Sequence, residues 1–211
     1  MTGNDVAARL GAQARRRQRG DHDLNPGFEP SGIHNPAAVL VPLVDHGDRL
    51  NVLLTRRAEH LHRHANQIGF PGGRLEDIDG DPATFEAAVA GALRETEEEI
   101  GLPSEAVAVM GGLDVYITRT GFDVTPVVGL VKPPLSLTLD TFEVTEAFEI
   151  PLSFFLDETN HRRETRKFNG ADRHFYAMSH GERFIWGATA GMLRNLFEVL
   201  TDPDHKPRPR P

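Results

Sequence analysis

The chain has 211 residues, 39% hydrophobic and 26% charged, a composition typical of a globular protein rather than a disordered or fibrous one. With 31 acidic residues against 23 Lys and Arg, the formal charge of -8 argues against a nucleic-acid partner held mainly through its phosphates. The absence of cysteine excludes disulfides and thiolate chemistry, and no apolar run approaches the roughly 20 residues that span a bilayer. We therefore expect a soluble, cytoplasmic protein with no membrane partner.

The two ends of the chain differ from its middle in composition. Residues 1–35 combine four arginines between positions 15 and 19 with several Gly and Pro residues, which predicts a short helix within a flexible, solvated N-terminal arm. A transit peptide is the alternative for this stretch, but the serines usual in such peptides are missing. Residues 201–211 carry four prolines beside charges and predict a disordered tail. A single domain is expected between them, at residues 36–200.

Branched apolar runs separated by turn residues predict several β-strands. Ala38–Val44 and Leu50–Thr55 flank the turn sequence Asp45-His46-Gly47-Asp48, which is typical of a β-hairpin. Pro42 cannot donate a ladder hydrogen bond, so the first strand is expected at a sheet edge or at a bulge. Further strands are predicted at Ala106–Met110, Leu113–Thr118, Asp123–Val131, Phe142–Glu149, Arg166–Phe168 and His174–Met178. Two long helices are predicted at Ala83–Ile100 and Trp186–Leu200.

The helix at Ala83–Ile100 has the clearest boundaries. Asp81 and Pro82 are expected as its N-cap and first turn, and Gly101 as its end. The stripe expected to face the core is formed by Phe85, Val89, Ala92, Leu93, Thr96 and Ile100. Glu95, Glu98 and Glu99 follow along one edge of that stripe, so the helix presents three carboxylates next to its buried face.

Three carboxylates at this place repel one another. Glu95 and Glu99 are a like-charged pair one turn apart, and the run lies near the helix C-terminus, where the helix dipole favours cations. No Lys or Arg follows one turn after Glu95 to reduce the repulsion. Glutamates in a run most often form a solvated face, but here a bound divalent cation would turn repulsion into attraction. Because the donors are carboxylates rather than thiols or paired imidazoles, Mg²⁺ or Mn²⁺ suits them better than Zn²⁺.

The end of this helix resembles a known motif. Arg94–Leu102, with the sequence R-E-T-E-E-E-I-G-L, is similar to the second half of the Nudix box, R-E-U-x-E-E-x-G-U. Upstream, the pattern can be completed by Gly80 with Glu86, or by Gly73 with Asp79 and an insertion before Arg94. Because Glu86 would point almost opposite to the acidic edge of the helix, we favour Gly73 with Asp79.

A second resemblance lies before the box. Leu53–Ala58, Gln67 and Phe70–Gly73 are similar to the signature L-L-T-x-R-[SA]-x3-R-x3-G-x3-F-P-G-G of coenzyme A pyrophosphatases. His62 and Asn66 stand where that signature has Arg and Gly. Two later segments also resemble this subfamily, Val124–Gly129 and Phe184–Gly191. The resemblance covers roughly residues 35–200.

This resemblance implies an α/β protein with the Nudix fold, a mixed β-sheet sandwiched between α-helices. It also implies a Mg²⁺- or Mn²⁺-dependent pyrophosphatase that hydrolyses coenzyme A or its derivatives to 3′,5′-ADP and 4′-phosphopantetheine products. His62 and Asn66 leave open a Nudix diphosphatase acting on ADP-ribose or dinucleotides. A nucleotide-binding module without turnover is a third, minor alternative, since all three box glutamates are present. The resemblance also allows a homodimer.

The same resemblance suggests a role for individual residues. Glu95 and Glu99 are expected as the principal metal ligands, Glu98 as a ligand or a water-orienting base, and the carbonyl of Gly73 as a further ligand. An additional base is expected from Glu143 or Glu146, which are three apart on a predicted strand, so at most one of them can reach the site.

We favour Glu143 as the catalytic residue of this pair, the alternative being that both face solvent. The residues expected to bind substrate are Arg57, Gln67, Phe70 and Gly72, with Arg57 contacting phosphate through its guanidinium or else belonging to a solvated basic loop.

Overall fold

The structure is a computed structural model and describes residues 1–11, 18–25, 27, 34–61, 64–168 and 170–202. Its larger sheet contains the strands β1 (Gln18–Gly20), β2 (Asn35–Asp45), β3 (Leu50–Arg57), β4 (Ile68–Gly69), β5 (Gly72–Arg74), β6 (Val107–Gly112), β7 (Val115–Ile117), β8 (Phe122–Val131) and β9 (Val144–Pro151). Its smaller, antiparallel sheet contains β10 (Arg162–Phe168), β11 (Ala171–His180) and β12 (Arg183–Trp186). The helices are α1 (Gly3–Gly11), α2 (Phe85–Ile100), α3 (Leu152–Phe155) and α4 (Ala188–Thr201). None of the helices in this described part is long and apolar enough to cross a membrane.

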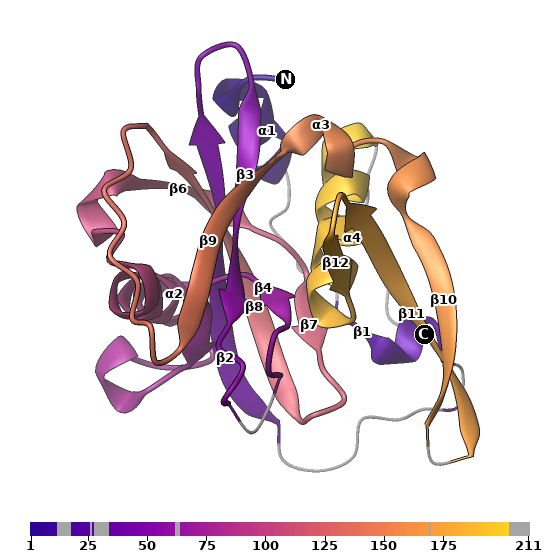
Figure 1. The fold of residues 1–211 in the computed structure, drawn as a ribbon. Helices are drawn as coiled ribbons and strands as arrows, with labels where there is room; N and C mark the ends of the chain where they lie inside the picture. Colours follow the sequence, from indigo (N-terminus) through magenta and orange to yellow (C-terminus); the bar gives the residue numbers. More distant parts are fainter. Residues whose placement is uncertain (12–17, 26, 28–33, 62–63, 169, 203–211) are drawn as a thin grey trace.

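The larger sheet is mixed and has helices on both faces (Figure 1). Its strand order is β1-β7-β8-β2-β3-β4, with β5 beside β2, β6 beside β8 and β9 beside β3. In β2, Ala38 and Leu40 pack on the α2 side, whereas Val41 and Leu43 pack on the α4 side. Because side chains alternate along a strand, this central strand is apolar on both faces. The mixed sheet sandwiched between helices is confirmed.

The predicted hairpin is confirmed, but the prediction for Pro42 is wrong. β2 and β3 pair antiparallel and close with Asp45 opposite Leu50, while β2 itself lies inside the sheet between β8 and β3. On its β3 side, β2 pairs with β3 only over residues 43–45 and with β5 only over residues 37–39. The Leu40 N–H points to this side, where it donates to the Pro71 carbonyl at 2.9 Å. The nitrogen of Pro42, two residues further on, therefore faces a gap in the ladder where no donor is required.

The other predicted elements are present with shifted bounds, and the start of α2 differs most. The N-cap is Thr84, whose Oγ1 accepts the Ala87 N–H at 3.2 Å, whereas the predicted cap Asp81 accepts the Ala83 N–H in the turn before. Gly101 ends the helix in a left-handed conformation with φ 67°, as its prediction as a stop requires. The sequence did not predict β1, β4, β5 or β12, whose two to four residues are too short to show a period.

Part of the arm predicted at residues 1–35 packs against the domain. In α1, Val6 and Leu10 are buried, and the helix contacts β6 and α4. Residues 12–17 and 28–33 of the arm, and residues 203–211 of the predicted tail, lie outside the described residues.

We expect Leu10→Ala to lower the free energy of unfolding by about 2–4 kcal/mol, because it leaves a cavity at a fully packed position. Leu10 is only 3% exposed. Asn4→Ala, on the exposed side of the same helix, is the matched control and should change stability by less than about 0.5 kcal/mol. Urea denaturation measures both, and equal midpoints for the two variants would mean that α1 is not part of the cooperative unit.

Candidate active site

Glu95, Glu98 and Glu99 form what we call the acidic run, and Glu99 is its most buried carboxylate. Its side chain is 5% exposed, its Oε2 accepts the Gly72 N–H at 3.1 Å, and its Oε1 lies 3.6 Å from Arg57 Nη1. Burial raises the pKa of Glu99 to about 7, although the Gly72 N–H and the Arg57 guanidinium act in the opposite direction. α2, β5 and the end of β3 thus meet at this carboxylate.

Glu95, one turn earlier, lies directly on Gly73. A Cβ added to Gly73 would overlap the Glu95 carboxylate, so a larger residue at this position would require the Glu95 side chain to move. Burial raises the pKa of Glu95, and Arg94 opposes this shift. The structure therefore brings Glu95, Glu99, Gly72 and Gly73 together, as the resemblance implies.

Arg94 is the centre of the ion-pair network. Its Nε and Nη2 donate to the two oxygens of Asp79, both at 3.0 Å, and its Nη1 donates to Glu95 at 2.8 Å and to Glu98 at 3.2 Å. The hydrogen bond to Asp79 raises the pKa of Arg94, and the same bond lowers the pKa of Asp79. Arg94 therefore relieves part of the repulsion among the glutamates, which the absence of Lys or Arg one turn after Glu95 did not predict.

The same network decides between the two ways of completing the motif. Asp79, with a side chain 3% exposed, is held by Arg94, whereas Glu86 is exposed on the first turn of α2. The pairing of Gly73 with Asp79 places both residues beside the acidic run. Glu86 lies at the other end of the helix, away from the acidic run.

The oxygen donors at this site fit a hard divalent cation. Glu95, Glu98, Glu99 and the Gly73 carbonyl would supply only oxygen atoms, which Mg²⁺ and Mn²⁺ prefer. Glu98 has a side chain that is 61% exposed and forms an ion pair with Arg94. Within the described residues, no three His, Asp or Glu side chains are grouped to hold a metal as they stand. Arg94 bridges Glu95 and Glu98. The metal-binding role of these residues stays a prediction.

The two candidate additional acids are in different surroundings. Glu143 lies in the turn before β9 rather than on a strand, and its Oε2 is 3.8 Å from Arg57 Nη2. Glu146 instead accepts hydrogen bonds from Arg56 and Arg183. Glu143 is thus the acid that the structure brings to the Glu99 side, and its role as a base stays a prediction.

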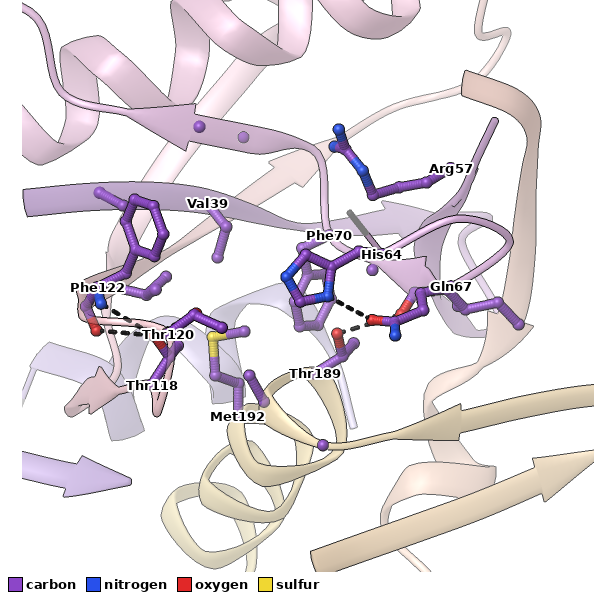
Figure 2. Close-up of a pocket in the computed structure, with 18 of the residues that line it drawn as sticks. Val39, Arg57, His64, Gln67, Phe70, Thr118, Thr120, Phe122, Thr189 and Met192 are labelled. Carbon is purple, nitrogen blue, oxygen red and sulfur yellow. Dashed lines mark hydrogen bonds between the residues drawn. The ribbon is translucent and has the colours of Figure 1, made fainter. Parts of the chain in front are cut away.

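A cavity of about 390 Å³ opens beside the acidic run (Figure 2). All four residues predicted to bind substrate line it, together with Gly73. In Figure 2, Arg57, Gln67 and Phe70 lie on one side, Thr118 and Phe122 on another, and Thr189 and Met192 of α4 form the floor. Its volume lies in the range of small-molecule sites.

The loop before β4 explains one departure from the signature. Asn66 has φ 59°, in the left-handed region that glycine adopts at the lowest cost and that asparagine tolerates better than most other residues. An asparagine can therefore stand where the signature has glycine. His64 Nδ1 lies 2.8 Å from Gln67 Oε1 and orients that side chain at the cavity. His62 is outside the described residues.

Sequence reasoning missed several residues of the site. Arg74, Arg119 and Asp21 also line the cavity. The Arg94–Glu98 pair has an i,i+4 spacing that could have been found from the sequence. No local signal points to Asp21, because its hydrogen bonds to Tyr116 and Arg119 join residues almost a hundred positions apart.

The chain is similar to several known proteins. A model of the NUDIX domain family matches residues 34–168. The chain is 39% identical over 163 residues to "Uncharacterized Nudix hydrolase NudL" of Escherichia coli (strain K12), covering 77% of this chain and 81% of that one. It is also similar to a solved NUDIX hydrolase from Alicyclobacillus acidocaldarius, with 20% identity, a TM-score of 0.46, and 62% and 84% of the two chains covered. A C. elegans Ap4A hydrolase is similar with 21% identity, a TM-score of 0.43, and 56% and 80% covered.

Proposed function

The chain belongs to the Nudix hydrolase family, and from this membership we propose that it is a divalent-metal-dependent pyrophosphatase of coenzyme A or its derivatives, with 3′,5′-ADP and 4′-phosphopantetheine products. One observation carries the choice of substrate. Arg57, Phe70 and Gly72, which match fixed positions of the coenzyme A pyrophosphatase signature, come together with Gln67 on the wall of one cavity beside the acidic run.

The charges around the cavity suit a substrate with several phosphates. The chain as a whole has a formal charge of -8, yet Arg57, Arg74 and Arg119 all line this cavity. Guanidinium groups bind phosphate oxygens through paired hydrogen bonds, which makes arginine well suited to a diphosphate. The cavity also has apolar surfaces from Val39, Phe70 and Met192, against which a nucleoside can pack.

Hydrolysis adds water to one phosphorus and breaks the anhydride P–O bond, so the site must hold the diphosphate and accept a proton. Arg57 lies between Glu99 and Glu143 and can hold the diphosphate next to both. Glu98 and Glu143 are the proposed bases, because Glu98 belongs to the acidic run, Glu143 lies near it, and both side chains are accessible. When bound by Glu95, Glu98, Glu99 and Gly73, Mg²⁺ or Mn²⁺ would neutralise phosphate charge and activate the water.

The test is product analysis with Mg²⁺ or Mn²⁺ and a panel of coenzyme A, acetyl-coenzyme A, ADP-ribose and NADH. We expect the two coenzyme A compounds to give 3′,5′-ADP, while the others react at least about tenfold more slowly, a difference of about 1.4 kcal/mol in transition-state binding. Cleavage of ADP-ribose or NADH with coenzyme A spared would replace the proposal by the dinucleotide alternative. Tight binding without any product would indicate a non-catalytic module.

A further inference from the structure

Residues 18–25 cross from the larger sheet to the smaller one, and we call them the 18–25 strap. β1 pairs parallel with β7, from Gln18 opposite Val115 to Gly20 opposite Ile117. Further along, Asn25 binds the main chain of β11, where it donates to the His174 carbonyl and accepts the His174 N–H, both at 2.9 Å. Figure 1 shows β1 between β7 and β11. The strap therefore ties β7 to the smaller sheet.

Asp21, in the middle of the strap, holds the turn between β7 and β8. Its Oδ1 accepts the Tyr116 hydroxyl at 2.8 Å, and its Oδ2 accepts the Arg119 N–H at 3.1 Å. The turn is closed by the Gly121 N–H, which donates to the Thr118 carbonyl at 3.2 Å. Both carboxylate oxygens of Asp21 thus bind the strand and the turn that carry Arg119.

Arg119 lines the cavity and belongs to a turn that lies across the cavity from Arg57. Thr118 and Thr120, its neighbours in the turn, are across the cavity from Arg57 in Figure 2. Arg57 contacts Glu99, so it belongs to the end of the cavity where the diphosphate is proposed to bind. A substrate that fills the cavity would reach Arg119 with a different part of its structure.

The surroundings of Arg119 also favour an anion. Desolvation lowers the pKa of Arg173 on β11, and the nearby charge of Arg119 lowers it further, while Asp21 raises it. Arg119 and Arg173 therefore lie close enough for their positive charges to repel each other, and Asp21 acts on the same group. A phosphate group at this place would reduce that repulsion.

We propose that Arg119, held by Asp21 of the 18–25 strap, recognises a substrate phosphate outside the diphosphate. This inference rests on the proposed function only in its choice of substrate, for which the phosphate is the 3′-phosphate of coenzyme A. Arg119 is then a specificity-determining residue that favours coenzyme A over dephospho-coenzyme A, and Asp21 is a positioning residue.

The first test compares the two substrates in Arg119→Ala. We expect kcat/KM for coenzyme A to fall by at least about tenfold, the usual effect of losing one charge-assisted hydrogen bond, while dephospho-coenzyme A changes by less than about twofold. Arg74→Ala, which removes another cavity arginine, is the matched control and should affect both substrates equally. An equal loss for both substrates in Arg119→Ala, or no loss for either, would overturn the proposal.

The second test separates positioning from general stability. Asp23 lies in the same turn of the strap as Asp21, but its carboxylate accepts the Gly20 N–H and it does not line the cavity. Asp21→Ala should reduce the preference for coenzyme A at least about threefold, whereas Asp23→Ala should keep it. A lower Tm for Asp21→Ala with an unchanged substrate preference would show that Asp21 is only structural.

Calorimetry with products makes the inference independent of turnover. We expect 3′,5′-ADP to bind the wild-type protein at least about tenfold more tightly than AMP, and Arg119→Ala to remove that difference. If the products bind in this way but the protein does not cleave coenzyme A, the Arg119 site is supported and the proposed function is rejected. Equal affinities of the wild-type protein for 3′,5′-ADP and AMP would overturn the Arg119 site itself.

Discussion

Glu99→Gln should lower kcat about a thousand-fold or more while the protein stays folded, which corresponds to about 4 kcal/mol of transition-state stabilisation. Glu99 is 5% exposed and touches both Gly72 and Arg57, the residues that frame the proposed diphosphate end of the cavity. A glutamine keeps the shape but not the negative charge that the proposed cation needs. Steady-state kinetics with the substrate identified by the panel measures the loss.

Two controls on the same helix make this test specific. Glu97→Gln removes an exposed charge whose oxygen accepts from Ser104, and we expect kcat within about twofold of wild type. Glu86→Gln alters the residue that the formal motif pattern would place in the site, and it should also be active. Full activity of Glu99→Gln, or inactivation by Glu86→Gln instead, would contradict the assignment of the acidic run as the active site.

Stability gives Glu99→Gln a second readout. Burial raises the pKa of Glu99 to about 7 in the folded chain, above the unfolded value of about 4.5, so the folded state binds the extra proton between these values. The metal-free wild type therefore loses stability as the pH rises from 4.5 through 7, and a glutamine does not. With EDTA present, Glu99→Gln should have the higher Tm at pH 8, and the difference should shrink towards pH 5. A variant less stable than wild type at pH 8 would contradict this.

The sequence predicted the features that depend on local periodicity. Gly101 ends α2 as predicted, and the helical period puts Glu95 and Glu99 on one edge of that helix. Of the predicted apolar stripe, Ala92, Thr96 and Ile100 are buried, whereas Phe85, Val89 and Leu93 are only partly buried. The hairpin of β2 and β3 follows from two branched runs around a short turn. Each of these relations joins residues close in sequence or fixed by a regular period.

Features that depend on distant contacts were not predictable in the same way. Asp81 and Thr84 are both good caps, and the choice between them is made by the folded turn rather than by their identity. Pro42 is tolerated inside the sheet because β3 and β5 leave a gap beside it, which only the strand order reveals. Asp21 joins the cavity through β1, a three-residue strand with no sequence signature.

Arg94→Ala should lower the free energy of unfolding by about 3–5 kcal/mol, the usual cost of removing one partner of a buried ion pair. Arg94 donates to both oxygens of Asp79, whose side chain is 3% exposed, so the variant leaves a carboxylate buried without its cation. Glu95 and Glu98 lose their shared donor at the same time, and kcat should fall as well. Urea denaturation and steady-state kinetics measure the two effects.

Three comparisons identify the paired hydrogen bonds to Asp79 as the cause. Arg94→Lys keeps the charge but cannot reach both oxygens in the planar arrangement of a guanidinium, so it should recover only part of the stability. Arg49→Ala removes the exposed pair with Asp48 and should cost less than about 1 kcal/mol. Combining Asp79→Ala with Arg94→Ala should cost much less than the sum of the two single changes, because the double variant no longer leaves the Asp79 carboxylate buried without its cation. If the two single costs simply add, Arg94 stabilises the fold through contacts other than Asp79. The interpretation that Arg94 couples Asp79 to the acidic run would then be rejected.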